Sequence, residues 1–143
     1  AKAMMQASIE SGLPIWLGIC AGPANEEGKV LAYEAKNILL KDVLKLISKE
    51  IEAVLIMHTE VNYIDNCLKE IRECYNGIVG AYPHKGYFKK PNWFHDDKYT
   101  PKIFYTDMLS WINKYDLKII GGCCGIGHKH IEYLHQKINS TIN

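Results

Sequence analysis

Four short apolar runs recur along the chain, and none of them alternates between hydrophobic and polar positions. A strand with one face in water alternates, whereas a parallel strand buried on both faces is hydrophobic at nearly every position. We therefore predict four buried parallel strands from these runs. They lie at Pro14–Cys20, Ala53–His58, Gly77–Pro83 and Lys118–Gly122.

Hydrophobic residues at helical spacing occupy the intervals between the runs. The clearest case is Val61–Tyr75, where Ile64, Leu68 and Ile71 fall on one face of a helix. Thr100 and Pro101 predict another helix start, because threonine caps amino termini well and proline suits the first helical position. The remaining helices are expected over Ala1–Ser11 with Gly12 as its stop, over Leu39–Ile51, and after Gly127.

Regular alternation of strands and helices predicts an α/β fold with a parallel sheet and right-handed crossovers. Two architectures fit, half of a closed (β/α)8 barrel or a small open doubly wound sheet, and periodicity does not choose between them. In both, the long stretches Ala21–Ile38 and His84–Tyr99 lie at the carboxyl-terminal edge of the sheet, where ligands bind. The chain opens within a helix that no strand precedes, so we expect the amino-terminal part of the fold to lie upstream.

Composition narrows the class of protein. The chain has 143 residues, 48% of them hydrophobic, which is enough for one globular domain. Its formal net charge of +1 gives no electrostatic case for nucleic acid or an anionic membrane as a partner. The longest apolar run, near Leu13–Ala21, is too short to span a bilayer. Five unevenly spaced cysteines argue against a disulfide framework and favour a reducing, cytoplasmic setting.

The strongest chemical signal is the pair Cys123 and Cys124, which follows the last predicted strand within the segment GGCCG. Adjacent side chains of a strand point to opposite faces, so both thiols reach one metal only if the backbone turns between them. The flanking glycines permit such a turn, and the amino terminus of the following helix favours thiolates, which suit zinc. The alternative interpretation is a glycine-rich turn that holds two small buried cysteines.

Several segments together resemble the homocysteine S-methyltransferase family. GGCCGIGHKHIEYL is similar to the signature that closes the barrel of that family, and Ser11–Trp16 resembles its fifth strand and entry. Ala81-Tyr82-Pro83, followed by Gly86 and Trp93, resembles the seventh strand and its loop. The resemblance implies that residues 1–143 form the carboxyl-terminal half, strands five to eight, of a (β/α)8 TIM barrel.

The resemblance also implies a zinc site of three cysteines, the adjacent pair after the eighth strand and a third after the sixth. Zinc in such a site binds the homocysteine thiol, lowers its pKa and presents a thiolate to a methyl donor. Here the sixth strand ends in Met57 and His58, where the family usually has Asn-Cys, and His84 stands where asparagine is common. Two cysteines and one histidine are a known catalytic zinc set, so we expect Cys123, Cys124 and His58 to hold Zn²⁺.

The function expected is therefore a zinc-dependent S-methyltransferase that acts on homocysteine or a related small thiol. Its partners would be that acceptor, a small methyl donor and the amino-terminal half of the barrel. Two alternatives stay open: a non-catalytic homologue that has lost the sixth-strand cysteine, and a barrel enzyme with another metal or acceptor. Among the other candidates, Glu60 could contact a substrate amine or simply begin the following helix, and the pattern favours the helix start. Cys67 and Cys74 share the inward stripe of one predicted helix, where packing explains both.

Overall fold

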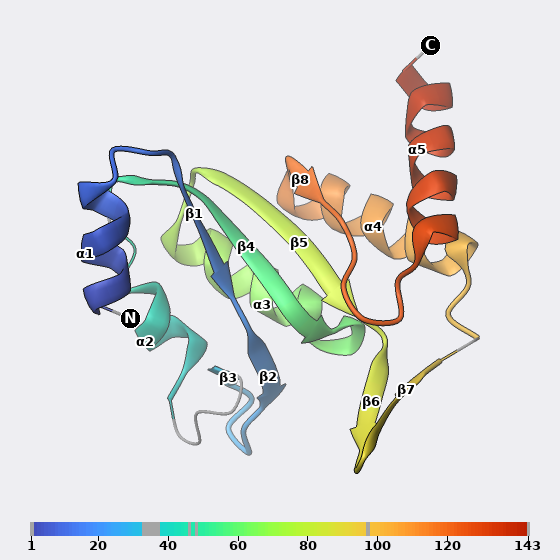
Figure 1. The fold of residues 1–143 in the computed structure, drawn as a ribbon, viewed down its shortest axis with the longest axis horizontal. Helices are drawn as coiled ribbons and strands as arrows, with labels where there is room; N and C mark the ends of the chain where they lie inside the picture. The colour runs from blue at the N-terminus through green and yellow to red at the C-terminus, as the bar shows by residue number, and fades with distance from the viewer. Residues whose placement is uncertain (1, 33–37, 46, 48, 97, 143) are drawn as a thin grey trace.

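The computed structural model describes residues 2–32, 38–45, 47, 49–96 and 98–142. Its centre is a parallel sheet of four strands in the order β1-β4-β5-β8 (Figure 1). All four predicted strands are confirmed, with bounds that differ by a few residues. They are β1 (Ile15–Ile19), β4 (Ile51–Glu60), β5 (Ile78–His84) and the short β8 (Ile119–Ile120).

Four of the predicted helices are also confirmed: α1 (Lys2–Glu10), α3 (Val61–Cys74), α4 (Pro101–Tyr115) and α5 (His128–Ile142). The Thr100 side chain caps α4 by accepting a hydrogen bond from the backbone N–H of Ile103. α3 and α4 lie behind the sheet in Figure 1, while α1 flanks the β1 edge and α5 stands beyond β8. The chain thus covers one face of the sheet with helices.

The two faces of the sheet differ in what they contact. Val54, Ile56, Val79 and Ala81 face the helices and belong to the single buried core, which also contains the inward residues of α3 and α4. Side chains of the opposite face include Trp16, which is 59% exposed. The structure therefore has an α/β fold with one helix-covered face and one open, partly apolar face.

One predicted helix is wrong in its length. The helix expected over 39–51 is α2 (Leu40–Leu44), and Ile51 is instead the first residue of β4, where it pairs with Ile15 of β1. Helical spacing continues past Leu44, but sheet pairing with a distant strand decides the conformation of Ile51. Positions 46 and 48 lie outside the described residues.

Each of the two long stretches after strands contains a β-hairpin that the pattern did not predict. The first pairs β2 (Ala21–Ala24) with β3 (Val30–Ala32), and the second pairs β6 (Gly86–Lys89) with β7 (Asn92–His95). Residues 33–37 of the first stretch lie outside the described residues. Both hairpins project from the carboxyl-terminal end of the sheet, as expected for these stretches (Figure 1).

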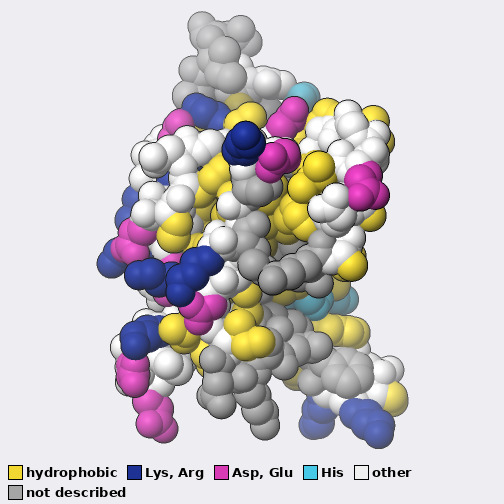
Figure 2. Space-filling view, turned by 90° about the vertical axis from the view of Figure 1, so that its left-hand side faces the viewer, with side chains coloured by type: hydrophobic (Ala, Val, Ile, Leu, Met, Phe, Trp, Pro, Cys, Tyr) yellow, Lys and Arg dark blue, Asp and Glu magenta, His cyan; other side chains and the backbone are white. Residues whose placement is uncertain are grey.

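The side of the molecule on which α1 and α2 lie mixes side chains of several kinds. Figure 2 shows basic and acidic groups interspersed on this side, with hydrophobic side chains reaching the surface between them. Met4 and Leu13 are among the large hydrophobic residues exposed by more than half. Within the described residues, no helix has both the length and the apolar character needed to cross a membrane.

Candidate metal centre

The backbone of β5 holds the cysteine pair in place. The Cys123 N–H donates to the Pro83 carbonyl at 2.9 Å, and the Lys85 N–H donates to the Cys124 carbonyl at 2.9 Å. Gly125 follows with φ of 81°, and a Cβ atom added there would collide with the Lys85 carbonyl. The backbone turns from Cys123 onward, because the Ile126 N–H donates to the Cys123 carbonyl at 3.0 Å, so the turn expected between the two cysteines is present, and it requires glycine at position 125.

His58 reaches the same place from the end of β4. The register between β4 and β5 shifts between Met57 and Glu60, and His58 has a φ of 43°, a left-handed conformation that is unusual for a non-glycine residue. The buried Thr59 hydroxyl holds this irregular segment by accepting from the Ala21 N–H at 3.0 Å and donating to the Met57 carbonyl at 2.9 Å. The irregular end of β4 turns the imidazole toward the cysteines.

The three side chains converge at metal-ligand spacing. The Cys123 Sγ lies 3.6 Å from the His58 Nδ1 and 3.8 Å from the Cys124 Sγ, and one ligand atom from each residue falls within 4.8 Å of the others. Zinc binds sulfur at about 2.3 Å and imidazole nitrogen at about 2.0–2.1 Å, so tetrahedral ligands lie about 3.8 Å (S–S) and about 3.6 Å (S–N) apart. The geometry and the donor set therefore fit zinc with one open coordination position.

The thiol of Cys124 is not activated by its surroundings alone. Its partial burial raises its pKa, and the neighbouring Cys123 raises the pKa further through a side-chain hydrogen bond and its charge. Without a bound metal, this thiol therefore stays protonated at neutral pH. Binding a metal requires release of that proton, as is general for cysteine ligands.

A second group of side chains surrounds the histidine. His84 is buried, and its ring centroid lies 4.7 Å from that of His58. The Trp93 indole contacts both rings edge-on, at 5.8 Å from His58 and 6.0 Å from His84. Burial lowers the pKa of His84, and the nearby His58 lowers it further, while Glu60 raises it. His84 is therefore predominantly neutral at pH 7.

Glu60 stands at the start of α3, as expected, and its side chain also makes contacts that the sequence did not predict. The side chain makes no capping hydrogen bond to the helix. One carboxylate oxygen accepts from the Lys85 ammonium at 2.8 Å, and the other lies 3.7 Å from His84 Nε2. Sequence reasoning missed this contact and the role of Lys85. The available signal was that Glu60 and His84 end two strands predicted to be neighbours.

The remaining cysteines lie outside the three-ligand group among the described residues. Cys67 is buried in α3, as the stripe predicts, whereas Cys74 is exposed in the last turn, so the prediction that packing explains Cys74 is wrong. Cys20 is half-buried just after β1. Burial is the main cause of the raised pKa of Tyr82, and the charges of Cys20 and Cys123 raise this pKa further.

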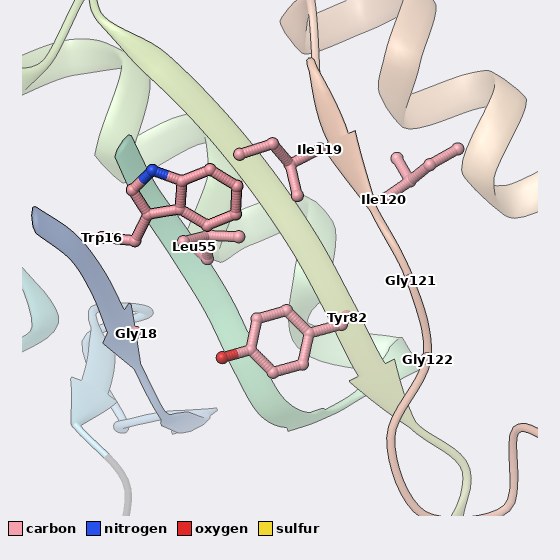
Figure 3. A pocket seen from close by; sticks show the side chains of 8 residues that line it. All are labelled: Trp16, Gly18, Leu55, Tyr82, Ile119, Ile120, Gly121 and Gly122. Atoms are coloured by element: carbon pink, nitrogen blue, oxygen red, sulfur yellow. The ribbon is translucent and has the colours of Figure 1, made fainter. Parts of the chain in front are cut away.

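A hollow of about 380 Å³ lies on the open face of the sheet. Figure 3 shows Trp16, Leu55, Tyr82 and Ile119 projecting from that face, and a Cβ added at Gly18 would lie 3.1 Å from the Tyr82 hydroxyl. Gly121 and Gly122, which lead to the cysteine pair, form another part of its wall. The hollow is thus mainly apolar and continues toward the candidate metal centre along the segment that follows β8.

Comparison with known protein families gives a match. The model of the homocysteine S-methyltransferase family matches residues 1–138, almost the whole chain. The chain therefore belongs to the homocysteine S-methyltransferase family, and methyl transfer is the activity that this family indicates. A search of curated proteins found no match to the chain.

Proposed function

We propose that the protein is a zinc-dependent S-methyltransferase that transfers a methyl group to homocysteine or a related small thiol. The observation that carries this proposal is the convergence of His58, Cys123 and Cys124 at the ligand separations of tetrahedral zinc, within a chain of this family. Zinc held there would supply a Lewis acid that keeps an acceptor thiol as its thiolate.

The chain's own residues would perform three tasks. The backbone of Pro83 and Lys85 holds the two cysteines, and the irregular end of β4 presents the histidine. The rings of His84 and Trp93 pack against His58 and restrict water beside it. Methyl transfer is a direct displacement, so an aligned donor and a dry site matter more than a proton-transferring side chain.

We further propose that the four strands are strands five to eight of a (β/α)8 barrel. The parallel order β1-β4-β5-β8 follows the chain, as in a barrel, and one sheet face carries partly exposed Trp16 and the apolar hollow. The partners would be the amino-terminal half of the barrel, a small thiol acceptor and a small methyl donor.

Zinc content and methyl transfer test the proposal together. We expect the purified wild-type chain to contain about one zinc per chain, and Cys123→Ser to lose it. Cys74→Ser is the matched control, because Cys74 is exposed on α3 and should leave the zinc content unchanged. Transfer to homocysteine is then measured with the amino-terminal half supplied and with S-methylmethionine, S-adenosylmethionine or betaine as donors. Zinc retained by Cys123→Ser contradicts the metal site, and zinc bound without transfer from any donor contradicts the activity.

A further inference from the structure

Residues 83–85, at the end of β5 and just after it, contact both halves of the candidate metal centre. The main chain of Pro83 and Lys85 hydrogen-bonds to the two cysteines, each at 2.9 Å. The side chain between them, His84, lies against His58 with ring centroids 4.7 Å apart. Position 84 is therefore where the cysteine half and the histidine half of the site meet.

His84 is itself held on several sides. It is only 6% exposed, Trp93 contacts its ring, and the Glu60 carboxylate lies 3.7 Å from its Nε2. The same carboxylate is fixed from its other oxygen by the Lys85 ammonium at 2.8 Å. A side chain confined in this way provides a rigid wall for the neighbouring ring.

The Nδ1 atom of His84 is buried and has no hydrogen-bond partner. A buried polar atom left unpaired destabilises the folded state, so an apolar residue of the same shape would be the more stable choice for simple packing. Unsatisfied groups of this kind in native structures call for a functional explanation.

His58 needs a neighbouring side chain to confine its ring. It sits at a strand irregularity with a positive φ, where the local backbone does not confine the ring as a regular strand would. We propose that His84, held by Glu60, is a positioning residue that fixes the His58 ring with its Nδ1 toward Cys123. This inference rests on the proposed metal centre and assigns no contact between His84 and the metal. Partners that orient a metal-ligating histidine typically affect metal affinity by about 10–100-fold.

Titration with Co²⁺ tests the inference without any assay of activity. Thiolate-to-cobalt charge-transfer absorption reports the cysteines, and the visible ligand-field bands report the geometry of the whole site. We expect His84→Asn to weaken Co²⁺ binding by about 10–100-fold and to change the ligand-field bands while charge transfer persists. Glu60→Gln should change the ligand-field bands in the same direction as His84→Asn, but by a smaller amount. His128→Asn is the matched control, because His128 is an exposed histidine at the start of α5.

A double-mutant cycle separates positioning from a general structural effect. In a His58→Ala background there is no ring to position, so adding His84→Asn should not weaken Co²⁺ binding further. Equal losses in both backgrounds, or wild-type affinity and bands in His84→Asn, would overturn the inference. If His84→Asn does not fold, His84→Phe replaces it. Phenylalanine keeps the ring volume, so we expect ligand-field bands unchanged from wild type. The same double-mutant cycle in the His58→Ala background then still decides the question. Absence of thiolate–cobalt absorption in the wild-type chain instead overturns the proposed metal centre itself.

Discussion

The Nδ1 atom of His58 lies 3.6 Å from the Sγ of Cys123, although 65 residues separate them along the chain. β5 lies between β4, which carries His58, and β8, which precedes Cys123. The irregularity at the end of β4 and the glycine-flanked turn after β8 bring both side chains over the end of β5. The predictions that follow test these local features.

The Thr59 hydroxyl should be important for stability. Thr59→Val keeps the shape of the side chain but leaves the buried N–H of Ala21 without its acceptor. We expect the free energy of unfolding to fall by about 1–3 kcal/mol, measured by urea denaturation. Thr106→Val is the control, because that hydroxyl bonds a helix carbonyl at an exposed position and its loss should change stability by less than about 0.5 kcal/mol. Equal effects of the two substitutions would contradict the role of Thr59.

Gly125 should not tolerate a side chain. Gly125→Ala places a Cβ against the Lys85 carbonyl at a backbone conformation that alanine rarely adopts, so we expect a loss of at least about 2 kcal/mol. Gly127→Ala is the matched control two residues away, where an added Cβ meets no atom within 4 Å. Thermal unfolding of both variants checks the prediction. A Gly125→Ala protein as stable as Gly127→Ala would show that the turn adjusts freely.

The two cysteines of α3 should differ sharply in reactivity. Burial, with a smaller contribution from the nearby Glu70, raises the pKa of the Cys67 thiol to about 12, whereas Cys74 is exposed. Iodoacetamide at pH 8 should therefore modify Cys74 in the native protein and modify Cys67 only in urea. Trypsin cleaves after Lys69 and Arg72, so mass spectrometry separates the two sites. Equal labelling of both thiols in native buffer would contradict the packing of Cys67.

The identity of residue 58 should govern the zinc affinity. His58→Ala removes one of three ligand atoms, and we expect more than about 100-fold weaker binding, beyond the effect usual for outer partners of a metal site. His58→Cys supplies a thiolate at the same position and should keep one zinc per chain. Competition with a chromophoric chelator measures both affinities. A His58→Ala protein with wild-type affinity would leave the cysteine pair as the whole site.

The sequence could predict those elements whose signals are local. The apolar run at Ala53–His58 and the stripe of Ile64, Leu68 and Ile71 correspond to β4 and α3, because continuous and helical spacing reflect burial directly. The end of α2 could not be predicted in this way, because Ile51 joins β4 through pairing with Ile15, a contact between distant residues. The hairpin strands are only three or four residues long, too short for periodicity to reveal.

In the candidate site, too, the residues with local sequence signals could be predicted and the contacts between distant residues could not. Cys123 and Cys124 stand out through their flanking glycines, and His58 through its place at a strand end. The contacts around His58 could not be predicted, because Glu60, His84 and Trp93 come from three different elements and share no spacing. Trp93 was noticed only as part of the family resemblance, and its contact with both histidine rings depends on the β6–β7 hairpin.

The short strand β8 joins β5 through only two residue pairs, Gly80 with Ile119 and Ala81 with Ile120. A metal ion shared by His58 and Cys123 would tie this weakly paired end of the chain to β4, closing a loop between two residues that are 65 positions apart. For a covalent cross-link of that loop length, the lost freedom of the unfolded chain amounts to about 4 kcal/mol. The ion would then stabilise the fold as well as take part in the reaction. Removing it with a chelator should therefore speed amide hydrogen exchange in β8 and the start of α5 before it does so in β4.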